Sequence, residues 1–191
     1  MFRSSRIILN NTKKILTTMS NQQATNIPAI QTKLTNPNLT YQEIRVMKNK
    51  GTEPPNSSEF LLNEKNGVKG KYFCKNCGTL LYESTDMFES GCGWPSFHTS
   101  SSSIPSENAD TTVKNGDYII GKSGKRGIKD NNIIQYTDNS MGMERTEVCC
   151  LNCDSHLGHI FKGEGWERIL GEGKGNRYCI NGISLNFEKE K

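Results

Sequence analysis

Four cysteines occur as two Cys-x2-Cys motifs, a spacing with which proteins bind zinc. Cys74 and Cys77 form the first motif, and Cys150 and Cys153 form the second. Two residues between the thiols let both sulfur atoms point into one tetrahedral site, about 2.3 Å from the metal. Because four protein ligands leave no position for a substrate, the sequence predicts one structural zinc ion that joins two parts of a domain. Cys149 is also able to supply the third ligand, but the regular spacing favours Cys150.

Two further cysteines, Cys92 and Cys179, lie outside these motifs. Cys92 stands between two glycines, which give the backbone room to expose its sulfur atom. If the segment around Cys179 is a strand, Arg177 and Asn181 share its face, and a neighbouring guanidinium favours the reactive thiolate. The same face would then continue into Ile183, Leu185 and Phe187. Either cysteine alone is more typical of an ordinary half-buried residue.

Two of the three histidines lie close together, at His156 and His159. A lone histidine is usually structural, but this pair follows Cys153 by only three residues and would be held rigidly by the metal site. On a regular strand the two side chains point to opposite faces. Both therefore reach one site only if a bulge or turn forms at Gly158.

The elements that must position these residues are short. The segment Thr40-Tyr41-Gln42-Glu43 matches a capping box, which predicts a helix with Ile44 and Met47 on its apolar side and Gly51 at its end. Beyond it, short apolar runs are separated by turn residues, which is typical of an all-β domain. We expect strands within 71–73, 79–82, 133–136, 147–151, 159–161 and 180–187. The stretches 99–130 and 163–175 are predicted to be long surface loops.

The composition limits the class of protein. The chain has 191 residues, of which 33% are hydrophobic, and this share is too small for a large core. The apolar runs are too short to cross a membrane or to form the core of a secretory signal peptide. Seven cysteines are too few for a disulfide-rich scaffold, and their number is odd.

The net charge of +4 comes from the beginning of the chain. Residues 1–42 contain no Asp or Glu and are rich in Ser, Thr and Asn, which is typical of a mitochondrial presequence, with a basic tail as the alternative. We expect a presequence at 1–23, a linker at 24–38, a domain at 39–188 and a tail at 189–191. If Met19 serves as a second start, a cytosolic form results. The charge gives no reason to expect nucleic-acid binding.

Four motifs together resemble the type B methionine sulfoxide reductases, which act on the R epimer of the sulfoxide. They are the segments 90–97, 142–148, 156–161 and 177–181, with the two cysteine motifs between them in the family's order. The resemblance spans about 39 to 187, and the insertion that begins at Gly163 is similar to that of fungal mitochondrial members. It implies two small antiparallel sheets around a four-cysteine zinc site, with a short N-terminal helix and long loop insertions. This agrees with the all-β prediction.

The resemblance also implies an activity, the repair of oxidised proteins in the oxidative stress response. By this resemblance Cys179 is the nucleophile that attacks the sulfoxide sulfur. His156 and His159 protonate the leaving oxygen, a role that suits imidazole because its pKa lies near working pH. Methionine then leaves, and Cys179 becomes a sulfenic acid.

The same resemblance assigns the remaining site residues. Trp94 packs on the methyl group of the sulfoxide, while Arg177 and Asn181 orient the site. Cys92 matches the resolving cysteine, which would form a disulfide with Cys179 that thioredoxin reduces. We expect the protein to be a monomer.

Two departures from the family's pattern and two rival hypotheses accompany this interpretation. The family usually has a small pair such as Ser-Ala where this chain has Gly182-Ile183, and Ser-His where it has Ser140-Met141. The first rival is a non-catalytic zinc-bound β module that binds a protein or nucleic-acid partner. A general thiol–disulfide oxidoreductase would need a Cys-x2-Cys motif free of metal, and both such motifs are expected to hold the zinc.

Overall fold

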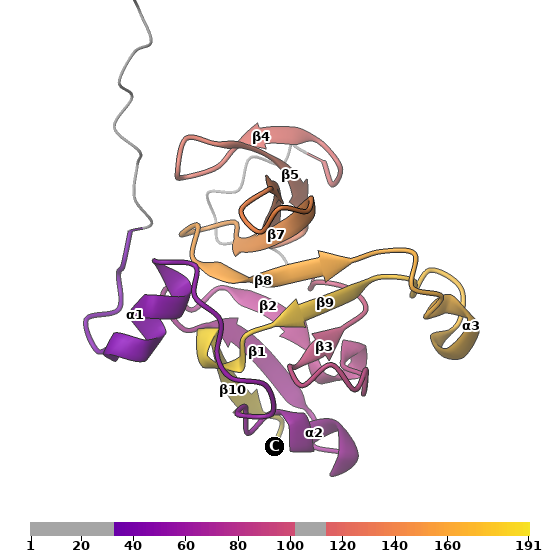
Figure 1. Ribbon diagram of the computed structural model, residues 1–191. Coiled ribbons are helices and arrows are strands. Elements are labelled where there is room, and N and C mark those ends of the chain that lie inside the picture. Colours follow the sequence, from indigo (N-terminus) through magenta and orange to yellow (C-terminus); the bar gives the residue numbers. More distant parts are fainter. Residues whose placement is uncertain (1–32, 102–113) are drawn as a thin grey trace, which may run out of the picture.

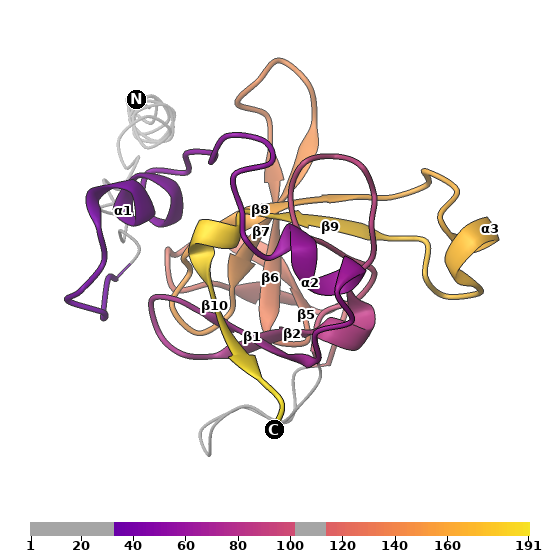
Figure 2. The same ribbon diagram turned by 90° about the horizontal axis from the view of Figure 1, so that it is seen from below.

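The computed structural model describes residues 33–101 and 114–191 of the chain. It contains two antiparallel sheets, one with strand order β10-β1-β2 and one with strand order β3-β9-β8-β7-β6-β5-β4. Figures 1 and 2 show the small sheet lying against the large one, with the helices at the periphery. The predicted fold class, mainly β with two antiparallel sheets, is confirmed.

The elements follow one another closely along the chain. Three short α-helices lie at α1 (Tyr41–Met47), α2 (Leu61–Lys65) and α3 (Glu167–Leu170). The small sheet consists of β1 (Gly70–Cys74), β2 (Leu80–Glu83) and β10 (Leu185–Lys189). The large sheet consists of β3 (Ser96–Phe97), β4 (Tyr118–Ile120), β5 (Arg126–Asp130), β6 (Ile133–Asp138), β7 (Arg145–Cys150), β8 (His156–Phe161) and β9 (Arg177–Ile180). Short 3₁₀ turns occupy Ser84–Asp86 and Gly182–Ser184.

The predicted capping box starts helix α1. The backbone N–H of Thr40 donates to the Glu43 carboxylate at 2.6 Å, and the Glu43 N–H donates to the Thr40 hydroxyl at 3.3 Å. The helix ends earlier than predicted, at Met47, and Lys50 rather than Gly51 adopts a left-handed backbone with φ of 58°. This turn directs the Lys50 side chain to Glu147 on β7.

Aromatic side chains fill the space between the two sheets. Phe97 of β3 stacks on Tyr82 of β2 with ring centroids 4.3 Å apart, and it also meets the edge of Tyr72 of β1 at 5.2 Å. All three rings are fully buried. One modest core is therefore shared by both sheets, and it uses the face of the large sheet that carries Phe97 and Tyr178.

Three sequence predictions differ from the structure. The predicted loop 99–130 contains strands β4 and β5, whose hairpin extends the large sheet, and the predicted loop 163–175 contains helix α3. The predicted strand 180–187 is wrong, because β9 ends at Ile180 and a 3₁₀ turn leads into β10 of the other sheet. Ile183, Leu185 and Phe187 therefore do not continue the face of Cys179. The turn is held by distant residues that local sequence patterns do not reveal.

Part of the predicted linker 24–38 lies against the first cysteine motif. The side chain of Asn76, between Cys74 and Cys77, accepts hydrogen bonds from the backbone N–H groups of Thr35 and Asn36 at 2.7 and 3.1 Å. Its amide group donates to the carbonyl oxygen of Lys33 at 2.9 Å. Residues 33–36 thus form a strap over this motif. The predicted presequence lies outside the described residues.

Within residues 33–101 and 114–191, no helix is both long enough and apolar enough to cross a bilayer.

Candidate functional site

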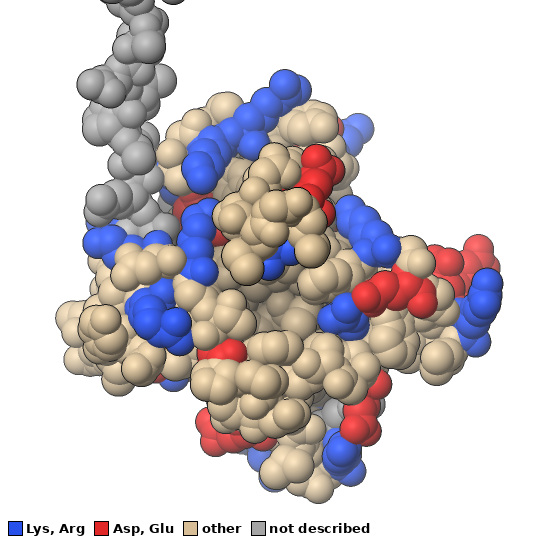
Figure 3. All heavy atoms as spheres, viewed as in Figure 1, with Lys and Arg blue, Asp and Glu red and all other residues tan. Residues whose placement is uncertain are grey.

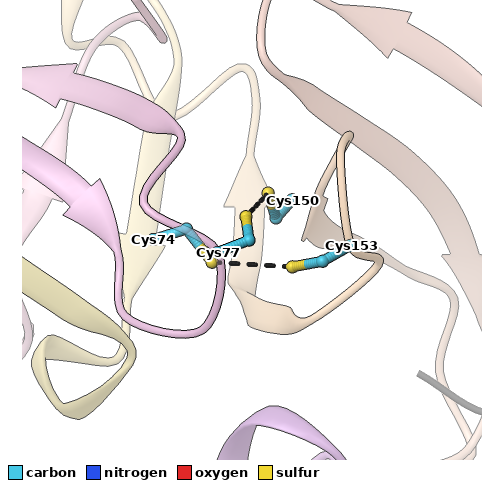
Figure 4. Close-up of side chains that lie close together, drawn as sticks. All are labelled: Cys74, Cys77, Cys150 and Cys153. Atoms are coloured by element: carbon cyan, nitrogen blue, oxygen red, sulfur yellow. Dashed lines mark hydrogen bonds between the residues drawn. The ribbon is translucent and has the colours of Figure 1, made fainter. Parts of the chain in front are cut away.

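The four cysteines of the two motifs form one cluster. Figure 4 shows the sulfur atoms of Cys74 and Cys153 facing each other at 3.7 Å, and those of Cys77 and Cys150 at 3.6 Å. All four sulfur atoms lie within 4.8 Å of one another. Sulfur ligands of a tetrahedral zinc ion lie about 3.8 Å apart when each is about 2.3 Å from the metal. The cluster therefore fits a metal ion of this kind.

The cluster also decides between the two neighbouring cysteines. Cys150 supplies the third sulfur atom, as its spacing predicted. Cys149 points to the other face of β7, where it is buried with Ile134 and Tyr136. Burial raises the pKa of the Cys149 thiol, so it remains protonated and apolar.

The register of the large sheet gathers the second set of predicted residues. Cys179 on β9 lies directly opposite His159 on β8 and Ser96 on β3, and His159 lies opposite Glu147 on β7. Directly opposed residues in an antiparallel sheet share a face. These side chains therefore form a row on the face that points away from the aromatic core. In Figure 1, β8 and β9 run side by side across the middle of the molecule, with α1 near one end and α3 near the other.

Cys92 lies next to Cys179. Their sulfur atoms are 3.6 Å apart, and the Cys92 sulfur is also 3.4 Å from the Ser96 hydroxyl. Cys92 sits in a loop where Gly91 and Gly93 have φ of 72° and 93°. These left-handed conformations suit glycine, as the sequence suggested, and they turn the sulfur towards β9. Both thiols are only half-buried.

Because the two sulfur atoms lie close together, the two thiols have different pKa values. The hydrogen bond with Cys179 lowers the pKa of Cys92 to about 4, despite burial. The same hydrogen bond and burial raise the pKa of Cys179, while the Arg177 guanidinium acts in the opposite direction and lowers it. The thiol pair therefore releases its first proton well below the usual pKa of a thiol and its second proton above it.

The two histidines reach one side of the sheet because β8 carries the predicted bulge. On β7, Val148 pairs with Gly158 and Cys149 pairs with His156, so that Leu157 is an extra residue. Gly158 is needed beside this bulge because a Cβ atom there would lie 2.0 Å from the carbonyl oxygen of Cys179. The two imidazole rings consequently lie 5.6 Å apart, centre to centre.

Each imidazole is held by a carboxylate that is itself paired with a cation. His156 Nδ1 lies 2.8 Å from Glu147, which also binds Lys50. His159 Nε2 lies 2.8 Å from Asp138, which binds Arg145 at 2.7 Å. Burial would raise the pKa of Glu147, but the bonds to His156 and Lys50 outweigh it and lower that pKa to about 2.

The two dyads differ in exposure. His156 is buried, whereas His159 is only half-buried. Burial lowers the pKa of His159, and the hydrogen bond with Asp138 opposes this effect. Each ring keeps one nitrogen atom that is not bonded to its carboxylate, and this atom can donate or accept a proton.

The remaining predicted residues are Trp94, Arg177 and Asn181, and each is held by a hydrogen bond to another segment of the chain. The Trp94 indole N–H donates to the backbone carbonyl of Glu53 at 3.1 Å. Arg177 makes two hydrogen bonds with the Glu164 carboxylate at 2.7 and 2.6 Å. Asn181 is buried, and its amide donates to the carbonyl of Leu157 at 2.9 Å.

Sequence reasoning missed the acidic residues that hold the site. They are Glu53, Asp138, Glu147 and Glu164. A signal existed for Glu147, since a charged residue precedes the apolar run Val148-Cys149-Cys150 in a predicted strand and so enters a buried environment. No comparable signal marks the other three, because each lies in a loop or at a strand end.

The charge distribution on this face is mixed. In Figure 3 the Lys and Arg side chains are scattered among Asp and Glu, and atoms in the middle of the face are mostly uncharged.

These features define a two-sheet β protein with a four-cysteine cluster able to hold a metal and a separate thiol pair beside two histidines. The chain belongs to the SelR domain family, whose model matches residues 39–119 and 122–189. It is 34% identical over 152 residues to "Peptide methionine sulfoxide reductase 2" of Saccharomyces cerevisiae, covering 80% of this chain and 73% of that protein. It is 37% identical over 154 residues to "Probable methionine-R-sulfoxide reductase B" of Caenorhabditis elegans, covering 81% and 77%. The resemblance seen in the sequence is thereby confirmed.

The acidity of the thiol pair can be tested by alkylation. We predict that Cys92 reacts with iodoacetamide with a midpoint near pH 4, so that its rate is already constant between pH 6 and 8. In Cys179→Ser the main stabilising partner is lost while Ser90 and Ser96 remain, so the midpoint should rise from near pH 4 towards the usual value of about 8.5. Mass spectrometry of the Cys92 peptide measures both rates. Equal midpoints near 8.5 in both proteins would contradict the shared proton.

Proposed function

We propose that this protein reduces the R epimer of methionine sulfoxide in oxidised proteins to methionine. The observation that carries the proposal is the distance of 3.6 Å between the sulfur atoms of Cys92 and Cys179, on the sheet face that also holds His159. The names of the related proteins support the same reaction. A non-catalytic binding module would not need this arrangement of thiols and proton donors.

The first step uses the proton that the thiols share. Moving that proton from Cys179 to Cys92 places the thiolate on Cys179, where Arg177 stabilises it. The thiolate attacks the sulfoxide sulfur, and His156 and His159 protonate the sulfoxide oxygen. A bond forms between the Cys179 sulfur and the sulfoxide sulfur, and the protonated oxygen leaves that sulfur as water. Water then attacks the Cys179 sulfur, methionine leaves with the electron pair of the sulfur–sulfur bond, and Cys179 becomes a sulfenic acid.

Substrate binding falls to the residues around the thiols. Trp94 offers an apolar surface to the methyl group of the sulfoxide, and Asn181 and Arg177 orient the groups at the reacting sulfur. The Glu164 carboxylate fixes the guanidinium of Arg177 through two hydrogen bonds. Arg177 therefore stays beside Cys179 instead of moving freely in solvent.

The second step restores the enzyme. The Cys92 thiol attacks the sulfenic acid sulfur, a Cys92–Cys179 disulfide forms, and water leaves. Because the sulfur atoms already lie 3.6 Å apart, small side-chain rotations bring them to bonding distance of about 2.05 Å. A dithiol of the thioredoxin class then reduces the disulfide by exchange.

The four-cysteine cluster is proposed to hold one structural zinc ion. Cys74, Cys77, Cys150 and Cys153 would bind it and so join the turn after β1 to the turn after β7. We further propose that the protein acts as a monomer. Its basic N-terminal segment is proposed to direct it to mitochondria, with a cytosolic form if Met19 is used as a start.

The proposed activity is tested with separated sulfoxide epimers. We predict that the protein reduces a peptide containing methionine-R-sulfoxide and leaves the S epimer unchanged. In Cys179→Ser the rate of methionine formation should fall by at least about a thousandfold, even in a single turnover, because the nucleophile is absent. Chromatography of the peptide measures the methionine formed. Equal turnover of both epimers, or activity in Cys179→Ser, would refute the proposal.

The resolving role of Cys92 is tested by separating one turnover from many. We predict that Cys92→Ser forms about one methionine per chain and then stops when thioredoxin is the reductant. The sulfenic acid should accumulate on Cys179 and be trapped there by dimedone. An unchanged steady-state rate with thioredoxin would show that Cys92 is not needed for recycling.

The metal site is tested with two adjacent cysteines as a matched pair. Elemental analysis should find one zinc ion per chain in the unaltered protein and in Cys149→Ser. Cys150→Ser should lose the metal and unfold at a lower temperature, because structural zinc contributes directly to folding. Loss of zinc in Cys149→Ser with retention in Cys150→Ser would contradict the ligand set.

A further inference from the structure

Glu53 lies between two segments of the site that are far apart in the sequence. It follows helix α1 in a loop and is buried, with 6% of its surface exposed. Its carboxylate accepts one hydrogen bond from the backbone N–H of Gly182 and another, at 3.2 Å, from that of Ile183. The two bonds go to different oxygen atoms of the carboxylate.

The backbone of the same residue contacts two of the proposed site residues. The Glu53 N–H donates to the side-chain oxygen of Asn181 at 3.0 Å, and the Glu53 carbonyl accepts from the Trp94 indole at 3.1 Å. One residue thus bonds to Trp94, to Asn181 and to the turn directly after Asn181. The thiols are placed differently, since Cys179 is held by the pairing of β9 with β3 and β8.

We propose that Glu53 is a positioning residue that holds Trp94 and Asn181 in place beside Cys179. This inference rests on the proposed function, because Trp94 and Asn181 are assigned to the substrate there. A buried carboxylate with two N–H donors is a strong, directional anchor for the turn at Gly182. It explains why β9 stops at Ile180 instead of continuing into one long strand.

The unusual Gly182 fits the same arrangement. A Cβ atom at this position would lie 2.0 Å from the Ser58 hydroxyl, five residues after Glu53. The turn therefore lies directly against the segment that carries Glu53, and glycine permits this contact.

A carboxylate is required here for a chemical reason. Gln has the same shape as Glu but only one acceptor oxygen, so its NH₂ group would face the N–H of Gly182 or Ile183. The variant would lose one hydrogen bond, and its NH₂ group and a backbone N–H would face each other in a buried environment without an acceptor. Glu53→Gln should therefore loosen Trp94 and Asn181 while the strand that carries Cys179 keeps its register.

The test compares Glu53→Gln with Glu59→Gln, a matched change at an exposed carboxylate of the same loop. Both are made in a Trp166→Phe background, which leaves Trp94 as the only tryptophan of the chain. We expect Glu53→Gln to increase quenching of Trp94 fluorescence by acrylamide and to raise KM for an R-sulfoxide peptide about tenfold. Alkylation of Cys179 should be unchanged, and Glu59→Gln should match its background protein.

Two outcomes would overturn the proposal. One is a Glu53→Gln protein with the background's quenching and KM. The other is a Glu53→Gln protein in which kcat and Cys179 reactivity fall by the same factor as KM rises, because this pattern indicates general damage to the fold. If Glu53→Gln does not fold, Glu53→Asp keeps the charge and withdraws the carboxylate by one methylene, and the same two readouts decide. Absence of R-sulfoxide turnover in the unaltered protein would refute the proposed function instead, while the fluorescence comparison still tests the positioning.

Discussion

The four-cysteine cluster joins two sheets whose common core is small. Cys74 and Cys77 come from the end of β1 and the turn after it, and Cys150 and Cys153 come from the corresponding part of β7. With only 33% hydrophobic residues in the chain, apolar burial alone gives a narrow margin of stability. A metal held by all four sulfur atoms would add folding free energy at the place where the sheets meet. It would also fix the start of β8, and with it the position of both histidines.

The two faces of the large sheet carry different kinds of residues. The inner face of the large sheet carries the aromatic residues of the core, whereas the outer face carries Cys179, His159 and Glu147 in one row. Because strand register aligns this row, the groups that we propose to react need no flexible loop to meet. Cys92 lies in a loop, which suits its proposed role of moving slightly to form a disulfide.

Local patterns in the sequence predicted the features that neighbouring residues determine. The capping box at Thr40, the four sulfur ligands and the bulge in β8 all depend on spacings of a few residues. The break after Ile180 escaped prediction because a carboxylate 129 positions away holds the turn at Gly182. The strands β4 and β5 were missed for a related reason. β5 is held by pairing with β6 and β4 by pairing with β5, whereas the segment around them is rich in Gly and Lys.

The strap formed by residues 33–36 has a consequence for maturation of the chain. Asn76 is 4% exposed, and its side chain bonds to Lys33, Thr35 and Asn36 as well as to Ser155. A protease that trimmed the chain beyond Asn36 would remove the hydrogen bonds to the strap, each of which contributes about 0.5–1.5 kcal/mol. Cleavage upstream of Lys33 leaves them intact. If the proposed presequence is removed, the strap therefore sets a downstream limit for the cleavage site, because the first cysteine motif depends on residues 33–36.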